Sequence, residues 1–202
     1  MKKHSKQMIL SLTIIFFIIL VLVKLDLTYG FDMTIYNLII SLKNDDLTSF
    51  VKFITNFGDT IYIIIILILS FIFFKNKLYP KLITINILSV VFINQILKHL
   101  IQRPRPDFPH LIKQGGFSFP SGHSMASFGF YGFFIYLIYK SNLNKKIKIL
   151  LITILSLLIL MIGLSRLYLG VHYATDVIAG FIVSLIILII FTSFIKKYLK
   201  KV

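Results

Sequence analysis

The chain has 202 residues, of which 57% are hydrophobic and only 14% are charged, and its net charge is +15. Soluble domains carry about 25% charged residues, so this composition excludes an ordinary soluble protein and indicates one that lies in a membrane. The absence of cysteine excludes disulfide bonds and thiolate metal sites. The length suits one domain, and we predict that residues 1–202 form a single membrane-embedded unit.

Six continuous apolar runs follow one another along the chain. Each approaches the roughly 17–25 residues that a helix needs to cross a bilayer. The runs do not alternate polar with apolar residues, which argues against a β-barrel. We therefore predict an all-α integral membrane protein with six transmembrane helices, at about residues 8–23, 60–74, 82–97, 124–139, 149–164 and 177–195. The first run lacks the cleavage pattern of a signal peptide, so we expect it to be retained.

The connection between the first two runs contains two shorter apolar segments. The segment MTIYNLIISL, residues 33–42, is too short to span a bilayer. Further along, apolar residues recur at helical spacing at Leu47, Phe50, Val51, Ile54 and Phe57. These patterns predict short helices in the membrane interface. Two roles stay open for them, a packed cap or a guide for substrate.

Basic residues are divided unequally between the two sides that six spans define. One side holds both termini and the loops after the second and fourth runs. Its basic residues are Lys2, Lys3, Lys6, Lys75, Lys77, Lys81, Lys140, Lys145, Lys146, Lys148, Lys196, Lys197, Lys200 and Lys201. By the positive-inside trend this side is cytoplasmic. Because topology and anionic lipid account for the net charge, we expect no nucleic-acid partner.

A few cations break this trend at the outer ends of spans. They occur in KHLIQRPRPDF, residues 98–108, and in SRLYLGVHYATD, residues 165–176. Charges and histidines at the end of a membrane span are costly unless they are paired or reach water, so such a cluster indicates a functional site.

His172 and Asp176 in the second of these segments are four residues apart. If the last helix begins near Val171, both lie on one face, and the carboxylate accepts a hydrogen bond from one ring nitrogen. The other ring nitrogen is then free to act as a nucleophile. Gly180 and Ser184 continue this face and allow close helix packing. Taken alone, such a pair is more often a His–Asp contact on a helix surface.

The stretch FSFPSGHSMASFG, residues 117–129, starts the fourth run with unusual residues. Pro120 and Ser121 are typical of a helix start, with Ser121 as the N-cap. Gly122 leaves the backbone N–H groups of the first turn open, and such a helix start binds anions. His123 then lies beside the anion. A plain capped helix start is the alternative for this motif by itself.

Together these segments supply what phosphoryl transfer requires. Cations and backbone donors hold the phosphate oxygens, one histidine attacks, and a second histidine protonates the leaving oxygen. Because the chain has no Glu and no Cys, and its seven acids are not clustered in sequence, we predict no metal site.

The pattern Lys98-x6-Arg105-Pro106, Pro120-Ser121-Gly122-His123 and Ser165-Arg166-x5-His172-x3-Asp176 resembles the three-part signature of the type 2 phosphatidic acid phosphatase superfamily. These are integral-membrane lipid phosphatases. The six-span outline is also similar to the bacterial branches of that family that act on phosphatidylglycerol phosphate and on undecaprenyl pyrophosphate. The resemblance covers residues 98–176.

This resemblance implies a role for each matched residue. His172 would attack phosphorus with Asp176 orienting it, and His123 would exchange the proton. Lys98, Arg105, Ser121, Gly122 and Arg166 would hold the phosphate, with no metal and no cofactor. The implied substrate is a lipid phosphate or pyrophosphate, met at the extracytoplasmic face of a bacterial plasma membrane, with no obligatory protein partner.

Other functions remain open from the sequence. A phosphotransferase of the same superfamily would carry the same residues, whereas a lipid-phosphate binder would need only the cations. A transporter would be expected to show charges at mid-membrane or broken helices in repeated halves, which are not seen. Arg103 and Lys113 lie outside the signature, and we interpret them as solvated loop charges rather than head-group contacts.

Overall fold

A computed structural model describes residues 3–199, and within this range the chain forms eight α-helices and no strands. They are α1 (Lys3–Lys24), α2 (Tyr29–Ile40), α3 (Asp45–Asn56), α4 (Thr60–Phe73), α5 (Leu78–Ile101), α6 (Gly122–Lys140), α7 (Lys145–Tyr168) and α8 (Ala174–Leu199). Each predicted span coincides with a helix, so the all-α membrane architecture is confirmed. The predicted cytoplasmic residues Lys2, Lys200 and Lys201 lie outside the described residues.

Four of these helices, α1, α5, α7 and α8, are long and apolar enough to cross a membrane. The 14 residues of α4 are too few for this, but α3 and α4 together form a fifth candidate with a 51° bend between them. The 19-residue α6 packs against α5, α7 and α8. Since protein covers so much of α6, it tolerates glycine, serine and histidine that lipid would not. The count of six spans stays a prediction.

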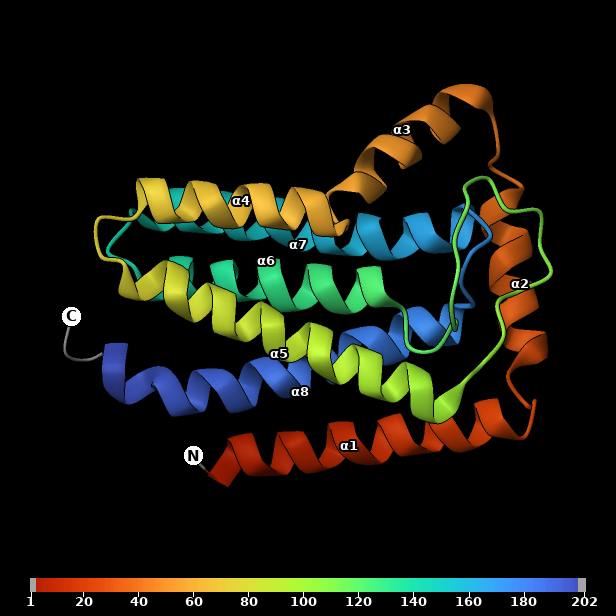
Figure 1. Cartoon of the computed structure of the whole chain (residues 1–202), viewed down its shortest axis with the longest axis horizontal. Helices are drawn as coiled ribbons and strands as arrows, with labels where there is room; N and C mark the ends of the chain where they lie inside the picture. Colours follow the sequence, from red (N-terminus) through yellow and green to blue (C-terminus); the bar gives the residue numbers. More distant parts are fainter. Residues whose placement is uncertain (1–2, 200–202) are drawn as a thin grey trace.

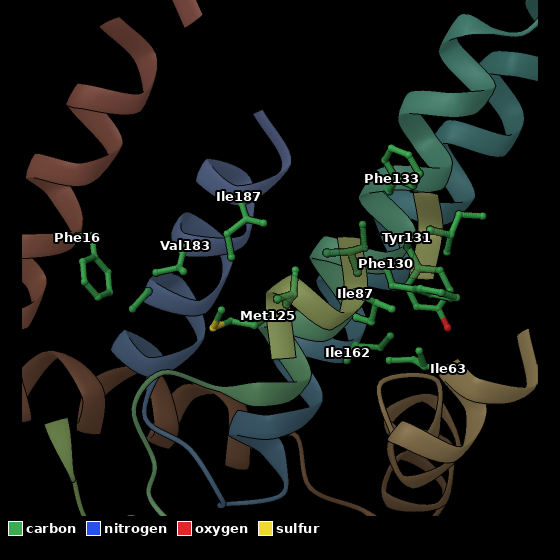
Figure 2. Close-up of a cluster of buried hydrophobic side chains, with 14 of the residues drawn as sticks. Phe16, Ile63, Ile87, Met125, Phe130, Tyr131, Phe133, Ile162, Val183 and Ile187 are labelled. Atoms are coloured by element: carbon green, nitrogen blue, oxygen red, sulfur yellow. The ribbon is translucent and has the colours of Figure 1, made fainter. Parts of the chain in front are cut away.

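The helix α6 lies within the bundle, and its small residues bring neighbouring helices close (Figure 1). A Cβ added at Gly129 would come 2.6 Å from Val90 of α5, and one at Gly180 would come 3.0 Å from the carbonyl oxygen of Ser121. Ser184 of α8 donates to the carbonyl oxygen of Met125 at 2.8 Å. The close packing predicted at Gly180 and Ser184 is therefore confirmed. Figure 2 shows the apolar side chains that fill the space between these helices.

The helices group their connections at the two ends of the bundle (Figure 1). The start of α1 and the last described turn of α8 lie at the same end of the bundle as the connections 74–77 and 141–144. At the opposite end, α2 lies across the bundle, near the segment 102–121 and the turn 169–173. The two short helices predicted in the first outer connection are present as α2 and α3. This end of the molecule brings together the motif residues of three separate segments, 98–106, 120–123 and 165–176.

Candidate active site

A cavity of about 630 Å³ opens between α4, α5 and the start of α6. Its polar residues include Asp59, Lys98, Arg105, His123 and His172. Most of its apolar residues come from α4 and α5, and these include Ile63, Ile64, Leu67, Ile87, Leu88 and Val91. One cavity thus joins a charged end to an apolar groove.

His172 lies in the turn before α8, which begins at Ala174. The prediction that His172 shares a helical face with Asp176 is therefore wrong, because the chain is not yet helical at that residue. The two side chains still meet, with 3.3 Å between Nδ1 and Asp176 Oδ2. On the other side of the ring, Nε2 is 3.2 Å from Arg105 Nη1. We predicted that this nitrogen would be free, and it is instead in contact with Arg105.

These contacts fix where the proton sits on the His172 ring. A guanidinium group can only donate hydrogen bonds, so Nε2 must accept from Arg105 and carry the lone pair. The proton of the neutral ring is then on Nδ1 and faces the Asp176 carboxylate. The nucleophilic lone pair therefore points toward the guanidinium group of Arg105.

Because His172 is buried, we expect the protein to lose stability in acid. Burial lowers the pKa of His172 from 6.5 to about 3. As pH falls through this window, the unfolded ring gains a proton that the folded ring does not, so the free energy of unfolding falls. We expect the wild-type melting temperature to drop more than that of His172→Gln between about pH 7 and about pH 4.5. Heating both proteins in detergent measures this difference, and equal drops would contradict it.

Asp176, in the first turn of α8, is completely buried and accepts from four groups. Arg103 Nη1 donates to its Oδ1 at 2.6 Å, and the Tyr173 N–H donates to Oδ2 at 2.9 Å. Ser118 Oγ also donates to Oδ2 and lies 3.2 Å from His172 Nδ1. With these donors the carboxylate stays ionised despite its burial. The sequence reasoning missed Ser118, although it stands only three residues before Ser121 in the same motif.

Arg103 is not the solvated loop charge that we predicted. Its side chain is only 11% exposed and bridges two buried carboxylates, Asp176 and Asp32 of α2. The Nη2 atom lies 2.9 Å from Asp32 Oδ2, and the guanidinium carbon lies 3.9 Å from the centre of the Tyr173 ring. Asp32 also accepts from the N–H and hydroxyl of Thr175, each at 2.9 Å. The prediction failed because the partners of Arg103 are supplied by distant segments.

Lys98 and Arg105 are held at the cavity by the segment that follows α5. Gln102 ends α5 in a left-handed conformation with φ of 52°, and the prolines after it prevent further helix. Lys98 Nζ donates to the carbonyl oxygen of Phe117, and Arg105 donates to those of Gly115 and Gly116. Arg105 Nη1 also donates to the carbonyl oxygen of Val171 at 2.7 Å. Both cations line the cavity as the motif predicts.

The start of α6 is built as predicted, with Ser121 as its N-cap accepting from the N–H of Ser124 at 3.4 Å. Ser121 is fully buried and does not line the cavity, whereas Gly122 and His123 do. His123 Nε2 lies 2.8 Å from Asp59 Oδ1, at the joint between α3 and α4. The sequence reasoning treated the acids as unclustered and missed Asp59, which precedes His123 by 64 residues.

Arg166 is completely buried near the end of α7. Its Nη1 donates to Thr55 Oγ1 at 2.7 Å and its Nη2 to Gln114 Oε1 at 2.8 Å. Unlike Lys98 and Arg105, it does not line the cavity that contains His172. Arg166 lines a different cavity, and Gln114, to which it donates, lines both. Within residues 3–199, no three histidine or aspartate side chains gather as a metal-ligand set.

Comparison with known proteins places these residues in a family. Residues 79–200 match the profile of the PAP2 superfamily. Phosphatidylglycerophosphatase B of Bacillus subtilis (strain 168) is 30% identical over 194 residues, which cover 93% of this chain and 94% of that protein. This match extends the likeness well beyond the three motifs.

Two solved structures are similar in fold. One is the first transmembrane PAP2 type phosphatidylglycerolphosphate phosphatase from Bacillus subtilis, with a TM-score of 0.86 and 27% identity, covering 94% of this chain and 96% of that one. The other is Aquifex aeolicus LpxE, with a TM-score of 0.66 and 26% identity, covering 80% of this chain and 94% of that one. Both the sequence profile and the full-length relative lead to the same assignment, and the chain belongs to the PAP2 superfamily.

Proposed function

We propose that this protein hydrolyses phosphatidylglycerol phosphate, undecaprenyl pyrophosphate or both, without a metal, through a phosphohistidine at His172. Within the PAP2 superfamily it is a lipid phosphate phosphatase, as its full-length relative is a phosphatidylglycerophosphatase. The proposal rests mainly on the orientation of His172. Its Nε2 lone pair points toward Arg105, in a cavity that has a charged part and an apolar part.

The proposed reaction has two steps. His172 Nε2 attacks phosphorus, the bond to the lipid oxygen breaks, and His123 gives that oxygen a proton. In the second step His123 takes a proton from water, the water oxygen attacks phosphorus, and the P–N bond breaks to release orthophosphate. Asp59 holds one ring nitrogen of His123, which leaves Nδ1 for the proton. Arg105, Lys98 and the Gly122 N–H stabilise the charge on the phosphate oxygens.

The apolar part of the cavity suits a lipid tail between α4 and α5. Ile64 on α4 is 48% exposed, and Leu88 and Val91 on α5 are 61% and 45% exposed, so these cavity residues also face the surroundings of the bundle. A lipid can then keep its tails in the bilayer while its phosphate reaches His172. By the lysine distribution, we place this site at the extracytoplasmic face and both termini in the cytoplasm.

The direct test is to supply each lipid to the purified protein in detergent with a chelator present. We expect release of orthophosphate from at least one lipid at a rate that the chelator does not change, because protein cations neutralise the phosphate. The ratio of the two rates identifies the preferred substrate. Loss of activity in chelator would contradict the metal-independent mechanism, and transfer of phosphate to an added lipid alcohol without release would indicate a phosphotransferase.

Gly58 offers a further prediction, because no side chain fits where His123 packs. A Cβ at Gly58 would come 2.9 Å from His123 Cδ2 and 2.8 Å from Ile162 Cγ2. We expect Gly58→Ala to displace the His123 ring and to lower the rate of phosphate release on the order of 10- to 100-fold. Gly30→Ala is the matched control, since a Cβ there meets open space. Equal rates for the two variants would show that the placement of His123 is unimportant.

A further inference from the structure

A second cavity, of about 490 Å³, is lined by Arg166, which does not line the cavity that contains His172. Its polar lining residues include Lys52, Thr55, Asp59, Lys113 and Gln114. Asp59 and Gln114 line both this cavity and the one that contains His172. Their side chains therefore form part of the wall between the two cavities.

The second cavity has an excess of positive charge. Lys52 and Lys113 are exposed, Arg166 is fully buried, and the single acid in the lining is Asp59, which pairs with His123. Among the residues that the structure describes, none of these three cations forms a salt bridge. A concave surface with unbalanced cations concentrates anions from solution.

Arg166 also has a donor without an acceptor. Its two terminal nitrogens are bonded to Thr55 and Gln114, whereas its buried Nε has no hydrogen-bond partner. A buried N–H of this kind is costly unless a ligand supplies the acceptor. Phosphate oxygens are strong acceptors for a guanidinium group. Arg166 therefore adds to the cavity lining a guanidinium group whose charge is not balanced by a salt bridge among the described residues.

We propose that this cavity binds orthophosphate on its way out of the active site, with Lys52 and Lys113 at the mouth and Arg166 at the inner wall. The inference rests on the proposed function, since orthophosphate is the product formed at His172. The lipid product stays in the groove between α4 and α5, so the two products leave by different routes. Orthophosphate would cross between the two cavities at Asp59 and Gln114, the two residues that line both.

The test compares Lys52→Gln/Lys113→Gln with the wild type in orthophosphate inhibition and in direct binding. We expect the double variant to raise the inhibition constant for orthophosphate about three- to tenfold. Its KM for phosphatidylglycerol phosphate should change less than about twofold, because the lipid does not pass this cavity. Lys113→Gln should account for part of the effect, whereas Lys43→Gln, which removes an exposed lysine from the connection between α2 and α3, should have none.

Two results would overturn the inference. One is an inhibition constant that does not change in the double variant. The other is an equal rise in the inhibition constant and in KM, which would make the lysines a general attractant for anionic substrate. Calorimetric titration of orthophosphate needs no turnover, so it decides the anion site even if neither lipid is hydrolysed. In that case the proposed function fails, while weaker binding by the double variant still supports the site.

The absence of cysteine provides a rescue that separates charge from folding. Lys113→Cys introduces a unique thiol, which an aminoethyl methanethiosulfonate reagent makes cationic and a sulfonatoethyl reagent makes anionic. We expect the cationic label to return orthophosphate affinity toward the wild-type value and the anionic label to lower it further. Equal affinity after both labels would contradict a role for charge at this position.

Discussion

His172→Ala should abolish phosphate release, with a loss of kcat on the order of 10⁴-fold or more, because it removes the only nucleophile that the mechanism uses. The side chain is buried and contacts Asp176, Ser118 and Arg105, none of which attacks phosphorus in the proposed mechanism. The rate of release from phosphatidylglycerol phosphate in detergent measures this loss. Turnover that survives the substitution would exclude His172 as the nucleophile.

His123→Ala is the informative companion, because the two histidines act in different ways. Loss of an acid–base group lowers the rate about 10²- to 10⁴-fold and slows both steps of the reaction. Loss of the nucleophile prevents the first step. With a substrate whose leaving group needs no proton, His123→Ala should form phosphoenzyme quickly and hydrolyse it slowly. A phosphoenzyme that forms in His172→Ala would contradict these assignments.

Arg103→Met should destabilise the fold more than any substitution of an exposed cation. It leaves the buried carboxylates of Asp32 and Asp176 without their shared guanidinium group. Removing one partner from a buried charge pair costs about 3–5 kcal/mol. For a chain of this length, that free energy corresponds to a melting temperature lower by roughly 6–20 °C. Thermal unfolding in detergent, followed by circular dichroism, measures the shift.

Lys113→Met serves as the matched control, since Lys113 is exposed and has no salt bridge among the described residues. Its effect should stay within about 0.5 kcal/mol. The loss of stability in Arg103→Lys should lie between those of Arg103→Met and Lys113→Met. A lysine keeps the positive charge, but its single ammonium group cannot donate to both carboxylates as the guanidinium group does. If Arg103→Met melts within about 2 °C of the wild type, the ion pairs do not hold the end of the bundle together.

The parts of the fold that could be predicted are those encoded locally. Apolar runs located every long helix, because lipid and core both require continuous apolar sequence. The helix start at Ser121 and the packing at Gly180 also follow from short patterns. The cations Lys98 and Arg105 were recognised because charge at the end of a membrane span is costly without a purpose.

The contacts that could not be predicted join distant segments. Asp32 meets Arg103 across 71 residues, and Asp59 meets His123 across 64. Neither acid stands in a pattern of its own, and only the packing of α2 and α3 against the end of the bundle brings them to the site. Arg103 was misread for the same reason, since its neighbours in sequence do not reveal that two carboxylates enclose it.

The central claim is a covalent bond between phosphorus and His172, and trapping that bond tests it most directly. Phosphatidylglycerol phosphate with a ³²P-labelled terminal phosphate is mixed with His123→Ala or wild-type protein and quenched in base, where phosphohistidine survives. We predict label on the peptide that contains His172, lost on treatment with acid and absent from His172→Ala. Label on another residue, or continuing turnover with no labelled protein in any quench, would contradict the account.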